Sequence, residues 1–128
     1  MKRILTTLKL MFIFIFSFPS SGLSQRGIKL KATEKKRLAL VIGNGSYKIA
    51  PLKNPANDAQ DMAKALREMG FEVIHKENAN RKVMKKAIKD FGRGLRYAGI
   101  GLFYYAGHGI QVNGNNYLIP IKDRKSVV

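Results

Sequence analysis

Runs of apolar residues alternate along this chain with stretches of helical periodicity. Residues 37–42 (RLALVI) form an almost continuous apolar run that ends at the turn-forming residues 43–46 (GNGS). A short apolar run bounded by turn residues is typical of a strand that is buried on both faces. Three further strands are predicted on the same grounds, at residues 71–75, 100–105 and, after a turn at residues 113–114, 115–121.

Two amphipathic helices are predicted between the first three strands. In residues 57–69 apolar side chains recur every three or four positions, which places them on one face of a helix. Asn57 is expected to cap this helix and Gly70 to end it. Asn80 is expected to cap the second helix, and Gly99 is expected to break it. The face of the second helix opposite its apolar residues is basic and carries Lys82, Lys85, Lys86, Lys89, Arg93 and Arg96.

The predicted order is strand, helix, strand, helix, strand, strand. Alternation with short connections implies parallel pairing and a doubly wound α/β layer, in which a mainly parallel sheet is flanked by helices. In such sheets reactive groups gather at the carboxyl ends of the strands. Two loops are therefore candidates for chemistry, residues 43–48 after the first strand and residues 106–109 after the third.

The loop after the first strand does not carry a phosphate-binding fingerprint. Its glycines, Gly43 and Gly45, would need a third glycine at position 48, where Lys48 stands. The chain also contains no Gly-Lys-Ser/Thr sequence, which excludes a P-loop. We therefore interpret these glycines as residues that only turn the chain.

The loop after the third strand places His108 between Gly107 and Gly109. Flanking glycines allow a positive φ and the close approach of another group, and they leave backbone N–H groups accessible to an anion. His108 thus has the parts of a general base beside an oxyanion site. A histidine that merely turns the chain fits the same spacing equally well.

The composition narrows the possible chemistry. The chain has 128 residues, with 24 Lys and Arg against 8 Asp and Glu and a formal net charge of +16. It contains no cysteine, which excludes disulfides, thiolate metal sites and a thiol nucleophile supplied by these residues. With only two histidines, His75 and His108, no metal site and no cofactor are predicted, and His75 is interpreted as structural. Nucleic-acid binding is disfavoured because no aromatic residues interleave with the lysines of the basic helix face.

Because acidic residues are few, their positions are informative. Asp58 and Asp61 fall in the first turn of the first predicted helix, where negative charge is favourable. That explanation suffices for Asp61. Asp58 lies nearer the loop at the carboxyl edge of the sheet, where its carboxylate could meet a cationic side chain.

The first 24 residues are predicted to be a signal peptide. A basic start (residues 1–3) is followed by the apolar residues 10–18 and by small, turn-forming residues, the order typical of such segments. The apolar run is far shorter than the roughly 20 residues that span a bilayer. We expect cleavage before Gln25, export to the periplasm or the medium, and no transmembrane helix afterwards; the alternative is an uncleaved N-terminal membrane anchor. Residues 25–36 are interpreted as a basic linker.

Three stretches of the chain resemble the large-subunit (p20-like) region of bacterial caspase-family peptidases of clan CD, peptidase family C14, near the metacaspases. They are residues 37–44 (RLALVIGN), 52–59 (LKNPANDA) and 103–120 (FYYAGHGIQVNGNNYLIP). The most specific of their motifs is Tyr-Ala-Gly-His-Gly directly after an apolar strand. The resemblance assigns residues 37–121 to a partial caspase-like domain and implies a caspase-like sheet of which only the N-terminal part is present.

The family works by a Cys–His dyad, so the resemblance implies roles for three residues. His108 corresponds to the catalytic histidine, and Gly109 to the glycine whose backbone N–H helps to hold the oxyanion. Asp58 corresponds to the acidic residue with which metacaspase-like members select Arg or Lys before the scissile bond. The implied partner is a peptide or protein substrate with basic residues.

The departures from the family are equally informative. The family's nucleophilic cysteine follows the histidine by roughly 50 residues, and no cysteine stands in this sequence. Residues 122–128 have no strand or helix pattern and are interpreted as a tail outside the family. We therefore expect the histidine-bearing, N-terminal part of a truncated cysteine endopeptidase, inactive as this chain. The alternative is a non-catalytic caspase-like binding module, and either could self-associate through a sheet edge left unpaired.

Overall fold

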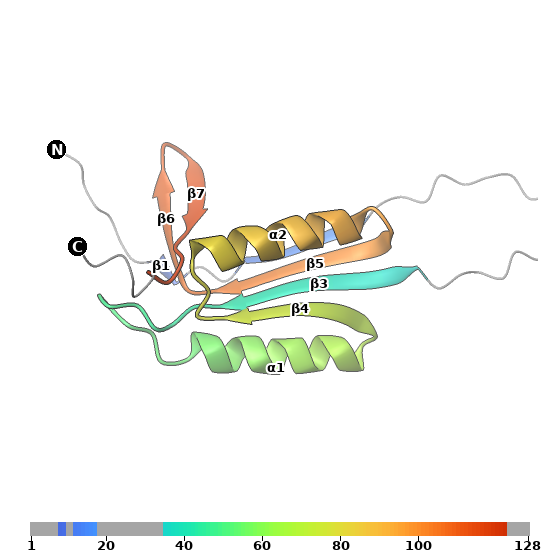
Figure 1. Ribbon diagram of the computed structural model, residues 1–128, viewed down its shortest axis with the longest axis horizontal. Coiled ribbons are helices and arrows are strands. Elements are labelled where there is room, and N and C mark those ends of the chain that lie inside the picture. The colour runs from blue at the N-terminus through green and yellow to red at the C-terminus, as the bar shows by residue number, and fades with distance from the viewer. Residues whose placement is uncertain (1–7, 10–11, 18–34, 123–128) are drawn as a thin grey trace, which may run out of the picture.

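A four-stranded sheet with one helix on each face forms the centre of the molecule (Figure 1). The computed structural model describes residues 8–9, 12–17 and 35–122. The strand order is β2-β5-β3-β4, and β3 pairs in parallel with both β4 and β5. The predicted mainly parallel sheet flanked by helices is thus confirmed. The helices and strands of the described residues are, in chain order, β1 (Leu8–Lys9), β2 (Phe12–Ser17), β3 (Lys36–Gly43), α1 (Pro55–Glu68), β4 (Phe71–Glu77), α2 (Arg81–Leu95), β5 (Ala98–Ala106), β6 (His108–Val112) and β7 (Asn115–Leu118).

The apolar run of β3 is continuous because both faces of the strand are buried. Successive side chains of a strand point to opposite faces. Leu38, Leu40 and Ile42 accordingly lie in one apolar cluster, while Ala39 and Val41 lie in the other. The first cluster includes Met84, Ala87 and Phe91 of α2, and the second includes Ala59, Ala63 and Leu66 of α1.

The structure corrects the predicted start of α1. The helix begins at Pro55, with Asn54 in the N-cap position, and Asn57 lies inside its first turn rather than capping it. Proline suits a first helical position because its fixed φ is helical and its missing N–H would have no partner there. Gly70 follows the helix with φ of 82°, as the sequence predicted for its end.

At α2 one end follows the prediction and the other does not. The side chain of Asn80 caps the helix by accepting a hydrogen bond from the backbone N–H of Val83 (2.9 Å). The helix ends at Leu95, however, and Gly99 already lies within β5. A side chain at position 99 would collide with that of Lys35, so close packing rather than helix breaking requires the glycine.

A hairpin of β6 and β7 stands beyond the carboxyl edge of the sheet (Figure 1). Asn113 and Gly114 form its turn with φ of 49° and 78°. The sequence predicted a loop where β6 begins, and it predicted one strand over residues 115–121. The observed β7 covers only the first four of those residues, since Pro120 lacks the N–H with which a strand would continue its ladder.

Parts of the predicted signal peptide pair with the rest of the molecule. Strand β2 lies antiparallel to β5, from Phe12 opposite Tyr105 to Ser17 opposite Ile100, and β1 pairs with β6. The expectation that residues 1–24 take no part in the fold is therefore wrong for β1 and β2, and the outer edge of β5 is occupied. Residues 18–34 and 123–128, which include most of the predicted linker and tail, lie outside the described residues. No helix in the described part is long and apolar enough to cross a membrane.

Close packing at the end of β3 makes Gly43→Ala a test of the fold. An added Cβ would lie less than 3.0 Å from the carbonyl oxygen of Pro55 and from Cβ of Ala59, so α1 would have to move. We expect a loss of about 1–3 kcal/mol of unfolding free energy, measured by urea denaturation. Gly92→Ala is the matched control, because a Cβ there meets nothing within 4 Å. Equal stability of the two variants would contradict this packing.

Candidate active site

A buried asparagine organises the carboxyl edge of the sheet. Asn44 directly follows β3 and is 0% exposed. Its backbone N–H donates to the carbonyl oxygen of Ala106 (2.8 Å), and its Oδ1 accepts from the N–H of Ala79 (2.8 Å). Asn44 thereby joins the end of β3 to the end of β5 and to the segment before α2. Sequence analysis did not single it out, although a polar residue between a buried strand and a turn was a usable signal.

The turn that follows Asn44 is held by a second asparagine. Oδ1 of Asn78 accepts from the backbone N–H groups of Gly45 and Ser46, both at 3.0 Å. The N–H of Asn78 in turn donates to the carbonyl oxygen of Gly43 (2.8 Å). The glycines of this loop serve the turn, as predicted, and also a close packing that was not predicted. The N–H groups of Gly45 and Ser46 already have a protein partner.

His108 begins β6 and is 7% exposed. Its Nε2 lies 2.6 Å from the carbonyl oxygen of Ala50, and its ring packs against that of Tyr47 with centroids 4.5 Å apart. Because a carbonyl oxygen can only accept, Nε2 must carry the proton, and Nδ1 of the neutral ring keeps its lone pair. The ring is thus oriented with one nitrogen held and the other able to accept a proton.

The carbonyl group that holds His108 comes from a strained position. This carbonyl group belongs to Ala50, which has φ of 53°. Few residues other than glycine adopt this left-handed conformation, and it costs on the order of 1 kcal/mol or more. Its neighbour Ile49 is 87% exposed, so this loop gains little from burial of that side chain. The carbonyl oxygen that contacts the histidine thus belongs to a residue with a strained backbone.

Two tyrosines hold the backbone around His108. The Tyr47 hydroxyl accepts from the N–H of His108 (3.1 Å) and donates to the carbonyl oxygen of Ile119 (2.8 Å). The Tyr105 hydroxyl donates to the carbonyl oxygen of His108 (2.8 Å). Burial, and the adjacent Tyr47 hydroxyl, raise the pKa of Tyr105 above its usual range, so it remains a neutral donor. Sequence analysis missed both roles, because one tyrosine lay in a loop and the other in an apolar strand.

Of the two backbone properties expected of the glycines beside His108, the structure shows close approach but not a positive φ. Neither Gly107 nor Gly109 has a positive φ; among the described glycines only Gly70 and Gly114 do. A Cβ at Gly107 would lie 2.5 Å from Oη of Tyr105 and 2.8 Å from Oη of Tyr47. The expected close approach of another group is therefore present, and the expected left-handed backbone is not. Gly109 is buried in β6, opposite Leu118 of β7.

Asp58 and His108 have different neighbours in the structure. Asp58 is exposed in the first turn of α1. Burial and then the Asp58 charge raise the pKa of Tyr104, whose side chain packs in the α1 cluster. Tyr105, which contacts His108, belongs instead to the α2 cluster. Among the described residues no hydrogen bond or ion pair joins Asp58 to His108.

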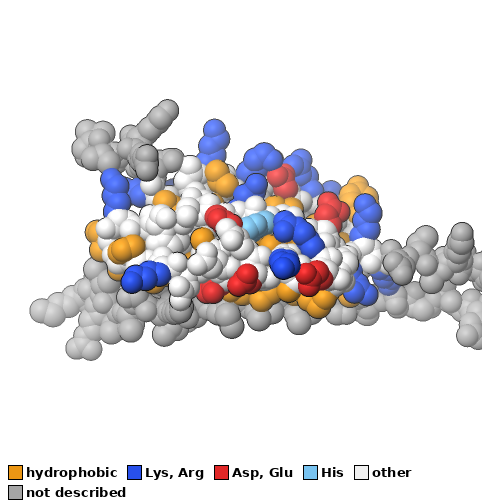
Figure 2. Space-filling view, turned by 90° about the horizontal axis from the view of Figure 1, so that it is seen from below, with side chains coloured by type: hydrophobic (Ala, Val, Ile, Leu, Met, Phe, Trp, Pro, Cys, Tyr) orange, Lys and Arg blue, Asp and Glu red, His pale blue; other side chains and the backbone are white. Residues whose placement is uncertain are grey.

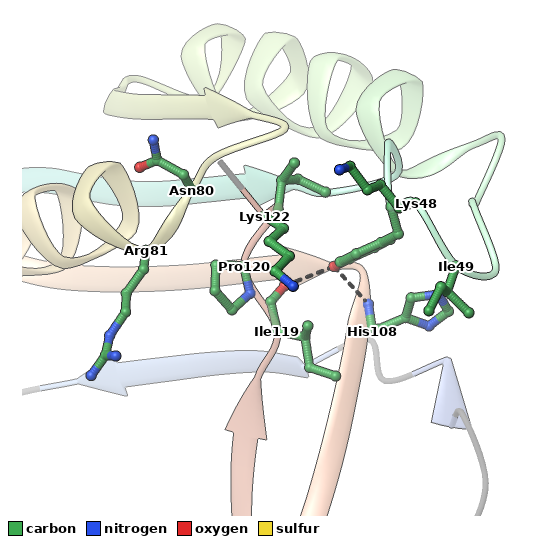
Figure 3. A pocket seen from close by; sticks show the side chains of 10 residues that line it. Lys48, Ile49, Asn80, Arg81, His108, Ile119, Pro120 and Lys122 are labelled. Carbon is green, nitrogen blue, oxygen red and sulfur yellow. Dashed lines mark hydrogen bonds between the residues drawn. The ribbon is translucent and has the colours of Figure 1, made fainter. Parts of the chain in front are cut away.

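His108 lines a cavity of about 710 Å³ at the beginning of α2 (Figure 3). Its walls combine apolar side chains of the loop and of the segment after β7 with the cations Lys48, Arg81 and Lys122. Asp58 is not among the residues that line it. In the described part of the chain no three His, Asp or Glu side chains gather into a group that could hold a metal ion. His75 lies on β4, with Nε2 3.2 Å from Oε1 of Glu77, and burial lowers its pKa.

The tautomer of His108 can be measured. We expect long-range ¹H–¹⁵N NMR at alkaline pH, where the ring is neutral, to show protonated Nε2 and unprotonated Nδ1. Tyr47→Leu should give a mixture of tautomers, because the ring loses its packing partner and its backbone loses an acceptor. Tyr117→Leu removes a tyrosine that is 51% exposed on the hairpin and should leave the spectrum unchanged. A protonated Nδ1 in the unmodified chain would contradict the contact with Ala50.

Comparison with known proteins places this geometry in a family. The family Peptidase_C14, described as the caspase domain, matches residues 36–128. Mucosa-associated lymphoid tissue lymphoma translocation protein 1 of Homo sapiens is 35% identical over 88 residues, which are 68% of this chain and 11% of that protein. Its Mus musculus homolog is 36% identical over 88 residues, again 68% and 11%. Caspase a of Danio rerio is 34% identical over 61 residues, 46% of this chain and 16% of that protein.

These relatives are much longer than the matched region, so the chain spans only a small part of each. No solved structure matches the chain significantly. The family match, in contrast, extends over most of the chain and includes every element from β3 to β7. The strand that leads into Gly107-His108-Gly109, the two helices and the three parallel strands all lie within it. The chain therefore belongs to the caspase domain family, peptidase family C14.

Proposed function

We propose that this caspase domain carries the histidine half of a cysteine endopeptidase site related to that of the metacaspases. The observation that carries the proposal is the contact between Nε2 of His108 and the carbonyl oxygen of Ala50 (2.6 Å). It leaves Nδ1 as the basic nitrogen of a ring that cannot turn easily.

The proposed chemistry uses both protonation states of His108. Nδ1 takes the proton of a cysteine thiol, and the thiolate sulfur attacks the carbonyl carbon of the scissile peptide bond. The imidazolium then gives that proton to the leaving amine as the C–N bond breaks. The backbone N–H of Gly109 is assigned to the oxyanion that forms between these steps. The 128 residues contain no cysteine, so the thiol must come from outside this sequence and the chain alone is inactive.

We assign the selection of Arg or Lys to Asp58. Its carboxylate is exposed at the beginning of α1, and no salt bridge to it is found among the described residues. An exposed carboxylate next to a peptide-binding edge favours a cationic side chain, and with Arg it can form two parallel hydrogen bonds. The ligand is accordingly a peptide or protein with basic residues.

We expect no cleavage of Arg- or Lys-containing fluorogenic peptides by the isolated chain. We expect cleavage when a cysteine-bearing segment of a caspase-domain relative is supplied in trans. His108→Ala should then lower the rate by about 10²–10⁴-fold, since it removes the general base.

In the same assay Asp58→Asn should reduce the preference for Arg over Gln by roughly tenfold. Asp61→Asn is the matched control, because it removes the same charge from the next turn of α1 and should change nothing. Cleavage by the chain alone that disappears in His108→Ala would contradict the claim of inactivity. If the His108→Ala variant kept the activity restored by the added cysteine, the proposed role of His108 as the base would be contradicted.

A second candidate function is a non-catalytic module that binds another chain through its sheet. The observation in favour is the pairing of β2 with six consecutive residues of β5, because it is consistent with an edge that accepts an added strand. Strand edges that lose a partner readily pair with another chain. We further propose that the N-terminal segment is an export signal, so its cleavage before Gln25 would remove β2 and free this edge.

The mass of the exported chain tests this second proposal. A mass that corresponds to residues 25–128 is expected, whereas an intact Met1 would contradict cleavage and favour a membrane anchor. Sedimentation velocity should then show concentration-dependent association of the processed chain, through strand pairing at β5. The full-length chain, in which β2 covers this edge, is the control and should associate less. A processed chain that is folded and strictly monomeric would contradict an edge-binding function.

A further inference from the structure

The described residues that line the cavity beside His108 include three cations and no carboxylate. Lys48 comes from the loop after β3, Arg81 from the first turn of α2 and Lys122 from the segment after β7 (Figure 3). Three separate parts of the chain thus place positive charge around one space of about 710 Å³. Its apolar walls lower the local dielectric, which strengthens the attraction of these cations for an anion. The remaining lining residues include Ile49, Ile119, Pro120 and Ile121.

The beginning of α2 adds to this positive field. The first turn of α2 has no acidic residue, and it begins with Arg81 and Lys82. The N-terminus of a helix is the positive end of its dipole, so cations there are unfavourable in the absence of an anion. Asp90 is the one carboxylate of α2; it lies about 13 Å further along the helix and is paired with Lys86 and Arg93. The field at the cavity is therefore not neutralised by α2 itself.

Most carboxylates of the described residues lie on α1 and β4, away from the cavity. Six of the eight acidic residues lie in the described part of the chain: three on α1, two on β4 and one on α2. Figure 2, which views the molecule from the α1 side, shows carboxylates among the Lys and Arg side chains of that face. Asp58 belongs to this face and does not line the cavity. A peptide across the carboxyl edge of the sheet would meet opposite charges on its two sides.

We propose that this cavity binds a carboxylate of the peptide ligand, so that the site prefers peptides with an acidic residue as well as a basic one. The inference rests on the proposed function in taking a peptide as the ligand and in assigning its basic residue to Asp58. Arg81 and Lys122 hold the carboxylate, and the apolar walls contact the methylene groups of the side chain that bears it. The acidic residue lies on the α2 side of His108, and the basic residue faces Asp58.

Titration of the full chain with matched peptides tests this proposal by NMR of the amides around Asn80 and Ile121. The probes contain one Arg and one Glu, with Glu on either side of Arg, and each has a counterpart in which Gln replaces Glu. We expect at least one Glu peptide to bind about tenfold more tightly than its Gln counterpart. The difference should shrink as salt is added. Equal binding of Glu and Gln peptides in both orders would overturn the proposal.

Variants separate the cavity from the general basicity of α2. Arg81→Gln should abolish the preference for Glu while leaving the melting temperature unchanged or higher, because it removes a cation from the positive end of a helix. A weaker binding therefore cannot be ascribed to unfolding. Lys89→Gln is the matched control, since it removes the same charge from α2 outside the cavity. An equal loss of the preference for Glu in both variants would overturn the assignment to the cavity.

Two further measurements identify the source of the carboxylate and separate this proposal from the proposed endopeptidase function. Acetate should bind far more weakly than the Glu peptides; equal affinity would overturn the peptide assignment and leave a site for small carboxylates. Failure of cysteine complementation in the cleavage assay would remove the endopeptidase proposal without affecting this titration. A Glu preference that depends on Arg81 would then still support the cavity, so the two proposals fail separately.

Discussion

The burial of Asn44 is the constraint on which the carboxyl edge of the sheet depends. At this edge three strands end together, and their terminal backbone groups need partners that neither a helix nor a strand provides. Asn44 supplies two such partners: its side chain accepts from the N–H of Ala79, and its backbone N–H donates to the carbonyl oxygen of Ala106. An unsatisfied amide at this depth would cost about 1–3 kcal/mol. The loop that carries Tyr47 and Ala50 and the strand that begins at His108 are therefore built on a polar network at the end of an apolar core.

One ring nitrogen of the buried His108 is held by a backbone carbonyl oxygen. A buried histidine is ordinarily a structural residue, and 7% exposure alone would suggest that here. The carbonyl oxygen of Ala50 orients the ring, because it accepts a hydrogen bond from Nε2 and so keeps the proton on that nitrogen. The tyrosine hydroxyls fix the backbone on either side. The left-handed Ala50 is the local strain that this arrangement requires.

The two helices give the two sides of the edge opposite electrostatic character. Both begin near the carboxyl ends of strands, where helix N-termini contribute positive potential. The first turn of α1 carries Asp58, which offsets that potential, whereas the first turn of α2 carries Arg81 and Lys82, which add to it. A sheet buried on both faces separates these charges by two apolar layers. The asymmetry is a property of the whole domain and could not be recognised from either helix alone.

The sequence by itself determined the elements whose cause is local. A continuous apolar run predicted β3, the Asn80 cap and helical spacing predicted α2, and glycines around a histidine indicated the site. Only the tertiary structure decided what depends on distant partners: the hairpin that begins at His108, the start of α1 at Pro55 and the pairing of β2 with β5. The roles of Tyr47, Tyr105 and Ala50 belong to the same class. Hydrogen bonds between residues some 60 positions apart leave no periodicity in the chain, so they become visible only when the sheet brings those residues together.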